Sequence, residues 1–139
     1  LSYLLVTLWN LLRSEARDYA LSIDGAAAET TRLHTGILAN TSSTGGGMKV
    51  APDADAEDGL FELVTFADMG RWEMLWKFPK LYSGTHIGVA GIGLLRARRL
   101  EIRALDESRP YPLNIDGEVC GRLPATFELI PRALPVLSE

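Results

Sequence analysis

The stretch "NIDGEVCGR", residues 114–122, places a carboxylate on each side of a glycine. Asp116-Gly117 is a two-residue hairpin signal, because glycine accepts the positive φ that such turns require. The turn would also hold Glu118 in a fixed direction, where its carboxylate could accept a proton from a substrate hydroxyl as a general base. Spacing alone leaves the structural and the catalytic interpretation both open.

A second copy of this turn provides an internal comparison. "SIDGAAAET", residues 22–30, repeats Ile-Asp-Gly but follows it with Ala26. The copy at residues 114–122 therefore differs from the first by carrying an acid directly after the turn.

The loop "DADAEDGL", residues 53–60, is a candidate cation site. Asp55 and Asp58 are three residues apart, and a turn here could add a backbone carbonyl near Leu60. Magnesium and calcium prefer such oxygen ligands. The alternative is a solvated acidic loop that turns at Gly59.

Two further features have structural interpretations. The glycines at residues 45–47 could approach a phosphate, but they lack the Lys-Ser or Lys-Thr of a P-loop, which favours a structural turn. Cys120 has no neighbouring histidine or lysine cluster to activate it, which favours a packing role.

Short strands would position these residues. The Asp24-Gly25 turn should follow a strand and precede a longer strand or strand pair that ends at residues 36–39. Further strands are predicted at residues 60–67 and within 96–105, 111–122, 125–131 and 133–139.

Two helices are expected to join this antiparallel β domain. Leucines at helical spacing predict one helix over residues 1–12; with no start methionine or capping residue ahead of it, we expect a fragment of a longer protein. A second helix should be capped by Asp68 and end at Pro79. Its Trp72, Leu75 and Trp76 share a face; this suits a membrane interface, although core packing is the favoured interpretation.

Composition limits the class of protein. The 139 residues are 47% hydrophobic and 23% charged with a net charge of −4, which is typical of one globular domain and gives no basic excess for nucleic acid. A single cysteine excludes an internal disulfide, and no apolar run is long enough to span a bilayer. We expect a cytoplasmic protein that could touch a membrane surface.

In order, three segments resemble the C-terminal domain of bacterial lipid kinases related to diacylglycerol and sphingosine kinases. They are "GGGMKVAPDADAEDGLFELV", a helix ending in "KLYSGTHI", and "YPLNIDGEVCGRLPATFELIPRALPVL". The resemblance covers nearly the whole chain. It implies one C-terminal β-sandwich domain over residues 1–139, with one N-terminal and one inserted helix, that completes a cleft for a lipid substrate.

The resemblance also implies site residues. The glutamate of the family's DGE motif falls on Glu118. This implies that Glu118 is the base that takes the proton from the lipid hydroxyl as that hydroxyl attacks the γ-phosphate of ATP. Asp116 would fix the turn and add negative charge near the magnesium nucleotide. The family's D-x-x-D-G-L metal site falls on Asp55, Asp58 and Leu60, the last through its carbonyl, and implies Mg²⁺.

One departure from the family limits the expected activity. Its ATP-binding lobe carries a GGDGT loop, and these 139 residues contain no GGDGT. Because phosphoryl transfer depends on positioning the phosphates, we expect no kinase activity from this chain without that N-terminal lobe. The alternatives are a stand-alone lipid- or ligand-binding module and a kinase of a soluble substrate related to NAD kinase. A homodimer remains open.

Overall fold

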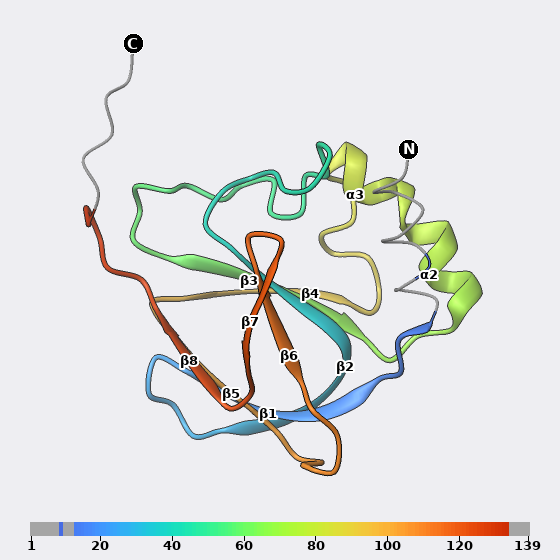
Figure 1. The fold of residues 1–139 in the computed structure, drawn as a ribbon. Coiled ribbons are helices and arrows are strands. Elements are labelled where there is room, and N and C mark those ends of the chain that lie inside the picture. The colour runs from blue at the N-terminus through green and yellow to red at the C-terminus, as the bar shows by residue number, and fades with distance from the viewer. Residues whose placement is uncertain (1–8, 10–12, 134–139) are drawn as a thin grey trace.

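The computed structural model describes Trp9 and residues 13–133, which form a curled antiparallel sheet, a separate hairpin and an inserted helical segment (Figure 1). In this part of the chain the large sheet has the strand order β4-β3-β2-β1-β5-β8, and β6 pairs with β7. The predicted mainly antiparallel β fold is confirmed. The elements are β1 (Arg17–Ile23), β2 (Glu29–Ala39), β3 (Phe61–Ala67), α2 (Arg71–Lys77), α3 (Pro79–Ser83), β4 (Ile92–Ala97), β5 (Arg99–Ala104), β6 (Pro112–Ile115), β7 (Glu118–Arg122) and β8 (Ala125–Glu128).

Two of the expected elements fall largely outside the described residues. The helix predicted for residues 1–12 is described at Trp9 alone, and the strand predicted for residues 133–139 is described at Ala133 alone. The remaining predicted strands correspond to β1, β2, β3 and the strands after α3.

Strand β3 separates two hydrophobic cores, because successive side chains of a strand point to opposite faces. Leu63 packs on one face with Leu21, Leu33 and Leu100. On the other face, Val64 and Phe66 pack with residues of the helical segment, of the loop that leads into it, of β4 and of the segment before β3: Met48, Val50, Ala51, Met69, Met74, Phe78, Leu81 and Ile92. Neither cluster contains a residue of the β6–β7 hairpin.

The inserted helical segment begins and ends differently from the prediction. Its N-cap is Gly70 without a side-chain cap, and Asp68 instead forms an ion pair with Arg32 of β2 at 3.1 Å. Pro79 is the first residue of α3. Proline is favoured at this position because the backbone N–H that it lacks would have no hydrogen-bond partner within the helix. Gly84, with φ 75°, ends α3. No helix in the described ranges is long and apolar enough to cross a bilayer.

The tryptophans of α2 do not lie in the core. Trp72 and Trp76 are 78% and 82% exposed, so the favoured core interpretation was wrong. The buried face carries Met74, Phe78 and Leu81, which follow the i, i+4, i+7 spacing of one helical side.

The strand predicted within residues 96–105 is divided in two. Strand β4 ends at Ala97 and β5 begins at Arg99. The backbone N–H groups of Arg98 and Arg99 both donate to Oδ1 of Asp24 at 2.9 Å. A side chain from the distant β1–β2 turn therefore fixes the break between the two strands, and local propensity does not reveal it.

The three glycines form the structural turn that was expected. Gly45, Gly46 and Gly47 all have positive φ, at 35°, 76° and 87°. On either side of them, Thr44 and Met48 exchange backbone hydrogen bonds of 2.9 and 3.1 Å. Glycine is needed here because consecutive left-handed conformations are costly for residues with a Cβ.

Candidate functional site

The β6–β7 hairpin contains the predicted two-residue turn. Asp116 and Gly117 have φ values of 51° and 94°, and Ile115 pairs directly with Glu118. Positive φ at both central residues is the conformation that matches the twist of a hairpin. The Oδ1 atom of Asn114 accepts the N–H of Gly117 at 3.0 Å and supports the turn from inside the hairpin.

The strands of this hairpin are open to solvent. Val119 is 71% exposed, and the other residues of β7 are exposed as well. Cys120 is exposed as well, so the packing role expected for it is wrong. Cys120 and Gly121 lie opposite the single residue Leu113, and Gly121 has φ 86°, which is the geometry of a β-bulge that twists the hairpin.

The candidate catalytic carboxylates have no partner within the described residues. Neither Asp116 nor Glu118 forms a side-chain hydrogen bond or an ion pair there, although both lie at the tip of an ordered turn. Asp24, in the other Ile-Asp-Gly turn, instead places its carboxylate against two backbone N–H groups. The two turns share a backbone conformation and differ in whether the carboxylate is already engaged.

A buried aromatic contact holds the base of the hairpin. Tyr111, just before β6, is buried, and its ring meets that of Tyr19 of β1 edge-on, with centroids 5.7 Å apart. The guanidinium of Arg17 lies 4.6 Å from the Tyr111 ring centroid. Burial raises the pKa of Tyr19, Tyr111 raises it further, and Arg17 opposes the rise. The sequence analysis missed this contact; a tyrosine directly before β6 was the available signal.

The acidic loop brings its three predicted ligands into one turn. Oδ1 of Asp55 accepts the N–H of Glu57 at 2.9 Å, and Oδ1 of Asp58 accepts the N–H of Leu60 at 2.8 Å. The donor set of two carboxylates and a carbonyl suits a hard cation in its chemistry. The described ranges contain no group of three or more acidic, histidine or cysteine side chains arranged for a metal.

Arg96 is the residue near this loop that the sequence analysis missed. Its guanidinium forms ion pairs with Oδ2 of Asp58 and with Oε1 of Glu62, the latter at 3.2 Å. Glu62 is buried on β3, and its Oε2 has no hydrogen-bond partner. Arg96 faces Glu62 in the β3–β4 register, so the pairing of two strands supplies a cation that the loop sequence does not show.

The two predicted sites remain separate. Across the described residues, no hydrogen bond or ion pair joins the hairpin tip at Glu118 to the loop at Asp55 and Asp58. The acidic loop instead connects to the β3–β4 pair, and the hairpin connects to β1 through Tyr111.

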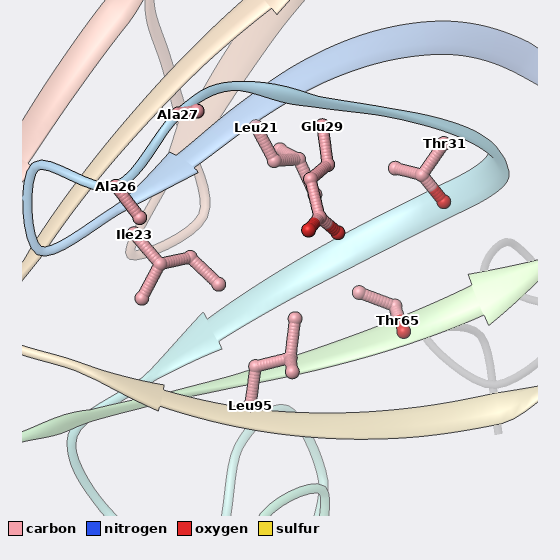
Figure 2. Close-up of a pocket in the computed structure, with 8 residues that line it drawn as sticks. All are labelled: Leu21, Ile23, Ala26, Ala27, Glu29, Thr31, Thr65 and Leu95. Atoms are coloured by element: carbon pink, nitrogen blue, oxygen red, sulfur yellow. The ribbon is translucent and has the colours of Figure 1, made fainter.

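A pocket of about 270 Å³ lies on the β1–β4 part of the sheet (Figure 2). The Asp24-Gly25 turn forms one rim through Ala26 and Ala27, and Glu29 directs its carboxylate toward the interior. The lining combines apolar and hydroxyl side chains and is completed by Leu21, Ile23, Thr31, Thr65 and Leu95. It can enclose an apolar group beside a few polar contacts.

The antiparallel fold with its exposed DGE hairpin defines a β-sandwich-like lobe, and comparisons with known proteins identify its family. Residues 1–138 match the model of the YegS C-terminal NAD kinase β-sandwich-like domain. The chain belongs to this family.

Curated relatives include diacylglycerol kinases. The diacylglycerol kinase of Mycobacterium tuberculosis H37Rv is 29% identical over 135 residues, covering 97% of this chain and 42% of the relative. That of Bacillus subtilis is 31% identical over 101 residues, covering 73% of this chain and 32% of the relative. The chain thus spans less than half the length of these relatives.

A solved structure shares the fold. A diacylglycerol kinase from Bacillus anthracis superposes with a TM-score of 0.69 at 19% identity, covering 93% of this chain and 42% of that chain. The predicted resemblance and fold class are confirmed by these matches.

Proposed function

We propose that this chain is the C-terminal lobe of an ATP-dependent lipid kinase that phosphorylates a diacylglycerol-like hydroxyl. The observation that carries the proposal is the free carboxylate of Glu118 beside the Asp116-Gly117 turn, in a chain whose relatives are named diacylglycerol kinases. An ordered backbone that holds an unengaged carboxylate is what a general base requires.

In the proposed reaction the lipid hydroxyl oxygen attacks the γ-phosphorus of ATP. Glu118 accepts the hydroxyl proton, an O–P bond forms, and the bond between the γ-phosphorus and the bridging oxygen breaks to release ADP. Asp116 contributes the turn and a negative charge near the magnesium nucleotide. The phosphates of ATP would be held by an N-terminal lobe, for which the greater length of the relatives leaves room.

A structural cation belongs to the same proposal. Asp55, Asp58 and the carbonyl of Leu60 would hold magnesium outside the reacting centre, and the ion would stabilise the acidic loop. Arg96 already forms an ion pair with Asp58, whereas Asp55 has no ion pair within the described residues, so Asp55 would gain the most from a bound cation.

We assign the acyl-chain end of the lipid to the pocket on β1–β4. Leu21, Ile23 and Leu95 provide apolar surface, while Thr31, Thr65 and the carboxylate of Glu29 provide the polar groups. A mostly apolar pocket with a few placed polar groups is typical of small-molecule sites.

The test is Glu118→Gln in the full-length protein, which keeps the side-chain shape and removes the base. We expect kcat for diacylglycerol to fall by about 100-fold or more, with an unchanged melting temperature because Glu118 is exposed and unpartnered. Glu107→Gln, at another exposed glutamate, is the control. A full chemical rate in single-turnover phosphate transfer would contradict the role of Glu118.

Two outcomes would point to the alternatives. Ligand binding by the full-length protein without any phosphate transfer would favour a binding module. Transfer to a soluble hydroxyl compound, with none to lipid, would favour a kinase of a soluble substrate.

A further inference from the structure

The outer face of α2 presents two tryptophans to solvent. Trp72 and Trp76 are one helical turn apart and are 78% and 82% exposed. Side chains at i and i+4 are neighbours on a helix surface, so the two indoles form one patch. Each indole has a large apolar surface, and an exposed apolar patch of this kind commonly marks an interaction site.

The helix is fixed in this orientation by its opposite side. Met74 is 3% exposed and Phe78 is 8% exposed, and both pack in the core beneath the helix. Phe78 and Tyr82 add an edge-on ring contact with centroids 6.1 Å apart. Turning the tryptophans inward would remove these buried contacts, so their exposure follows from the fold.

The charges around the tryptophan patch are unbalanced. Arg71 and Lys80 are exposed at its two ends, and neither forms an ion pair within the described residues. Lys80 continues the row at the next i+4 position. The nearest acid of α2, Glu73, is already paired with Lys77, whose ammonium lowers the pKa of Glu73. The patch therefore offers two aromatic rings between two free cations.

We propose that Trp72 and Trp76, with Arg71 and Lys80, form the surface through which this lobe docks onto an anionic lipid bilayer. Tryptophan favours the membrane interface because its ring is apolar and its N–H is polar. Lysine and arginine beside such a patch are attracted to lipid phosphates. This inference rests on the proposed function, since a diacylglycerol-like substrate lies in a bilayer.

The first experiment measures how strongly the 139-residue chain binds to vesicles of phosphatidylcholine, with and without phosphatidylglycerol. We expect Trp72→Ala with Trp76→Ala to weaken binding by roughly tenfold or more. Arg71→Gln or Lys80→Gln should each weaken binding to anionic vesicles by about fivefold and leave binding to neutral vesicles unchanged. Ile130→Ala, at an exposed residue outside the patch, is the control and should have no effect.

Salt and lipid quenching provide independent readouts. Raising salt from about 0.1 M to about 1 M shortens the screening length from about 10 Å to about 3 Å, and should release the chain from anionic vesicles. Lipids brominated near the headgroup should quench the fluorescence of Trp72 and Trp76, and Arg71→Gln with Lys80→Gln, which keeps both fluorophores, should reduce this quenching. Equal partition of the double tryptophan variant and the unaltered chain would overturn the proposal.

Two other occupants of the patch are distinguishable. Concentration-dependent dimers that the double variant abolishes, without vesicle binding, would assign the patch to a second copy. Vesicle binding by the chain but not by the full-length protein would assign it to another part of the protein. Either result overturns membrane docking.

The docking and the kinase function can fail separately. In the full-length protein, the double variant should raise KM for diacylglycerol in vesicles by about tenfold and leave kcat for a short-chain diacylglycerol in solution unchanged. An unchanged KM for vesicle diacylglycerol in the double variant, with intact turnover of the soluble substrate, would contradict docking alone. Absence of turnover by the unaltered full-length protein on both substrates would contradict the kinase function.

Discussion

Asp24 and Arg99 are joined by reciprocal hydrogen bonds. The Oδ1 atom of Asp24 accepts the backbone N–H of Arg99 at 2.9 Å, and the backbone N–H of Asp24 donates to the carbonyl of Arg99, also at 2.9 Å. The β1–β2 turn is thereby tied to the start of β5. Because Ala26 of this turn lines the pocket, the same bonds also position one rim of the proposed lipid site.

The Asp24 side chain can be tested against its counterpart Asp116. Both residues have φ near 50° in an Ile-Asp-Gly turn, so alanine imposes the same backbone strain at either position. Asp24→Ala additionally loses two hydrogen bonds, each contributing about 0.5–1.5 kcal/mol. We expect it to lower the free energy of unfolding by about 1–2 kcal/mol more than Asp116→Ala, measured by urea denaturation. If both variants lower the free energy of unfolding equally, the two hydrogen bonds of the Asp24 side chain make no net contribution to stability.

Arg96 should stabilise the fold by compensating the buried Glu62. Removing one partner of a fully buried pair costs about 3–5 kcal/mol, and we expect about 2 kcal/mol for Arg96→Met because its side chain is half exposed. Glu62→Leu in the same chain should recover most of that loss, because no buried charge then remains. Purely additive losses in the double-mutant cycle would contradict this coupling.

Magnesium should stabilise the acidic loop through Asp55. If the cation binds there, saturating magnesium will raise the melting temperature, by linkage to the folded state. Asp55→Asn should abolish the shift without disturbing the Asp58–Arg96 pair. Asp53→Asn, at an exposed acid in the same loop, is the control and should preserve it. If the unaltered chain has the same melting temperature with and without magnesium, the result would argue against the site.

Filling the pocket should weaken binding of the lipid. Ala27 lines the pocket and the adjacent Ala28 does not, although both are exposed. Ala27→Trp in the full-length protein should raise KM for diacylglycerol by roughly tenfold, the equivalent of about 1.4 kcal/mol. Its kcat should change little. Ala28→Trp provides the matched control, and an equal rise in KM from both would locate the lipid elsewhere.

Local patterns predicted the elements that local chemistry determines. The Asp116-Gly117 hairpin, the turn at residues 45–47 and the strand β3 follow from glycine conformation and alternating side chains. The helix after β3 was placed correctly, but its cap was not, because Arg32 from β2 engages Asp68.

Contacts between distant segments account for the features that were not predicted. Met74 and Phe78 are buried, and Trp72 and Trp76 on the other side of the helix are exposed. Both pairs are hydrophobic and have the same i, i+4 spacing, so the sequence pattern does not indicate which pair faces the core. Likewise, the ion-pair partner of Asp58 is Arg96, 38 residues further along the chain.

The exposed β6–β7 hairpin has a practical consequence for variant screening. Its residues belong to neither core, and its contact with the sheet is concentrated at Tyr111. Thermal denaturation reports mainly on cooperative melting of the packed strands. A library ranked by melting temperature would therefore retain substitutions at residues 115–120 that loosen this segment, and amide hydrogen exchange, which measures local opening, would detect them.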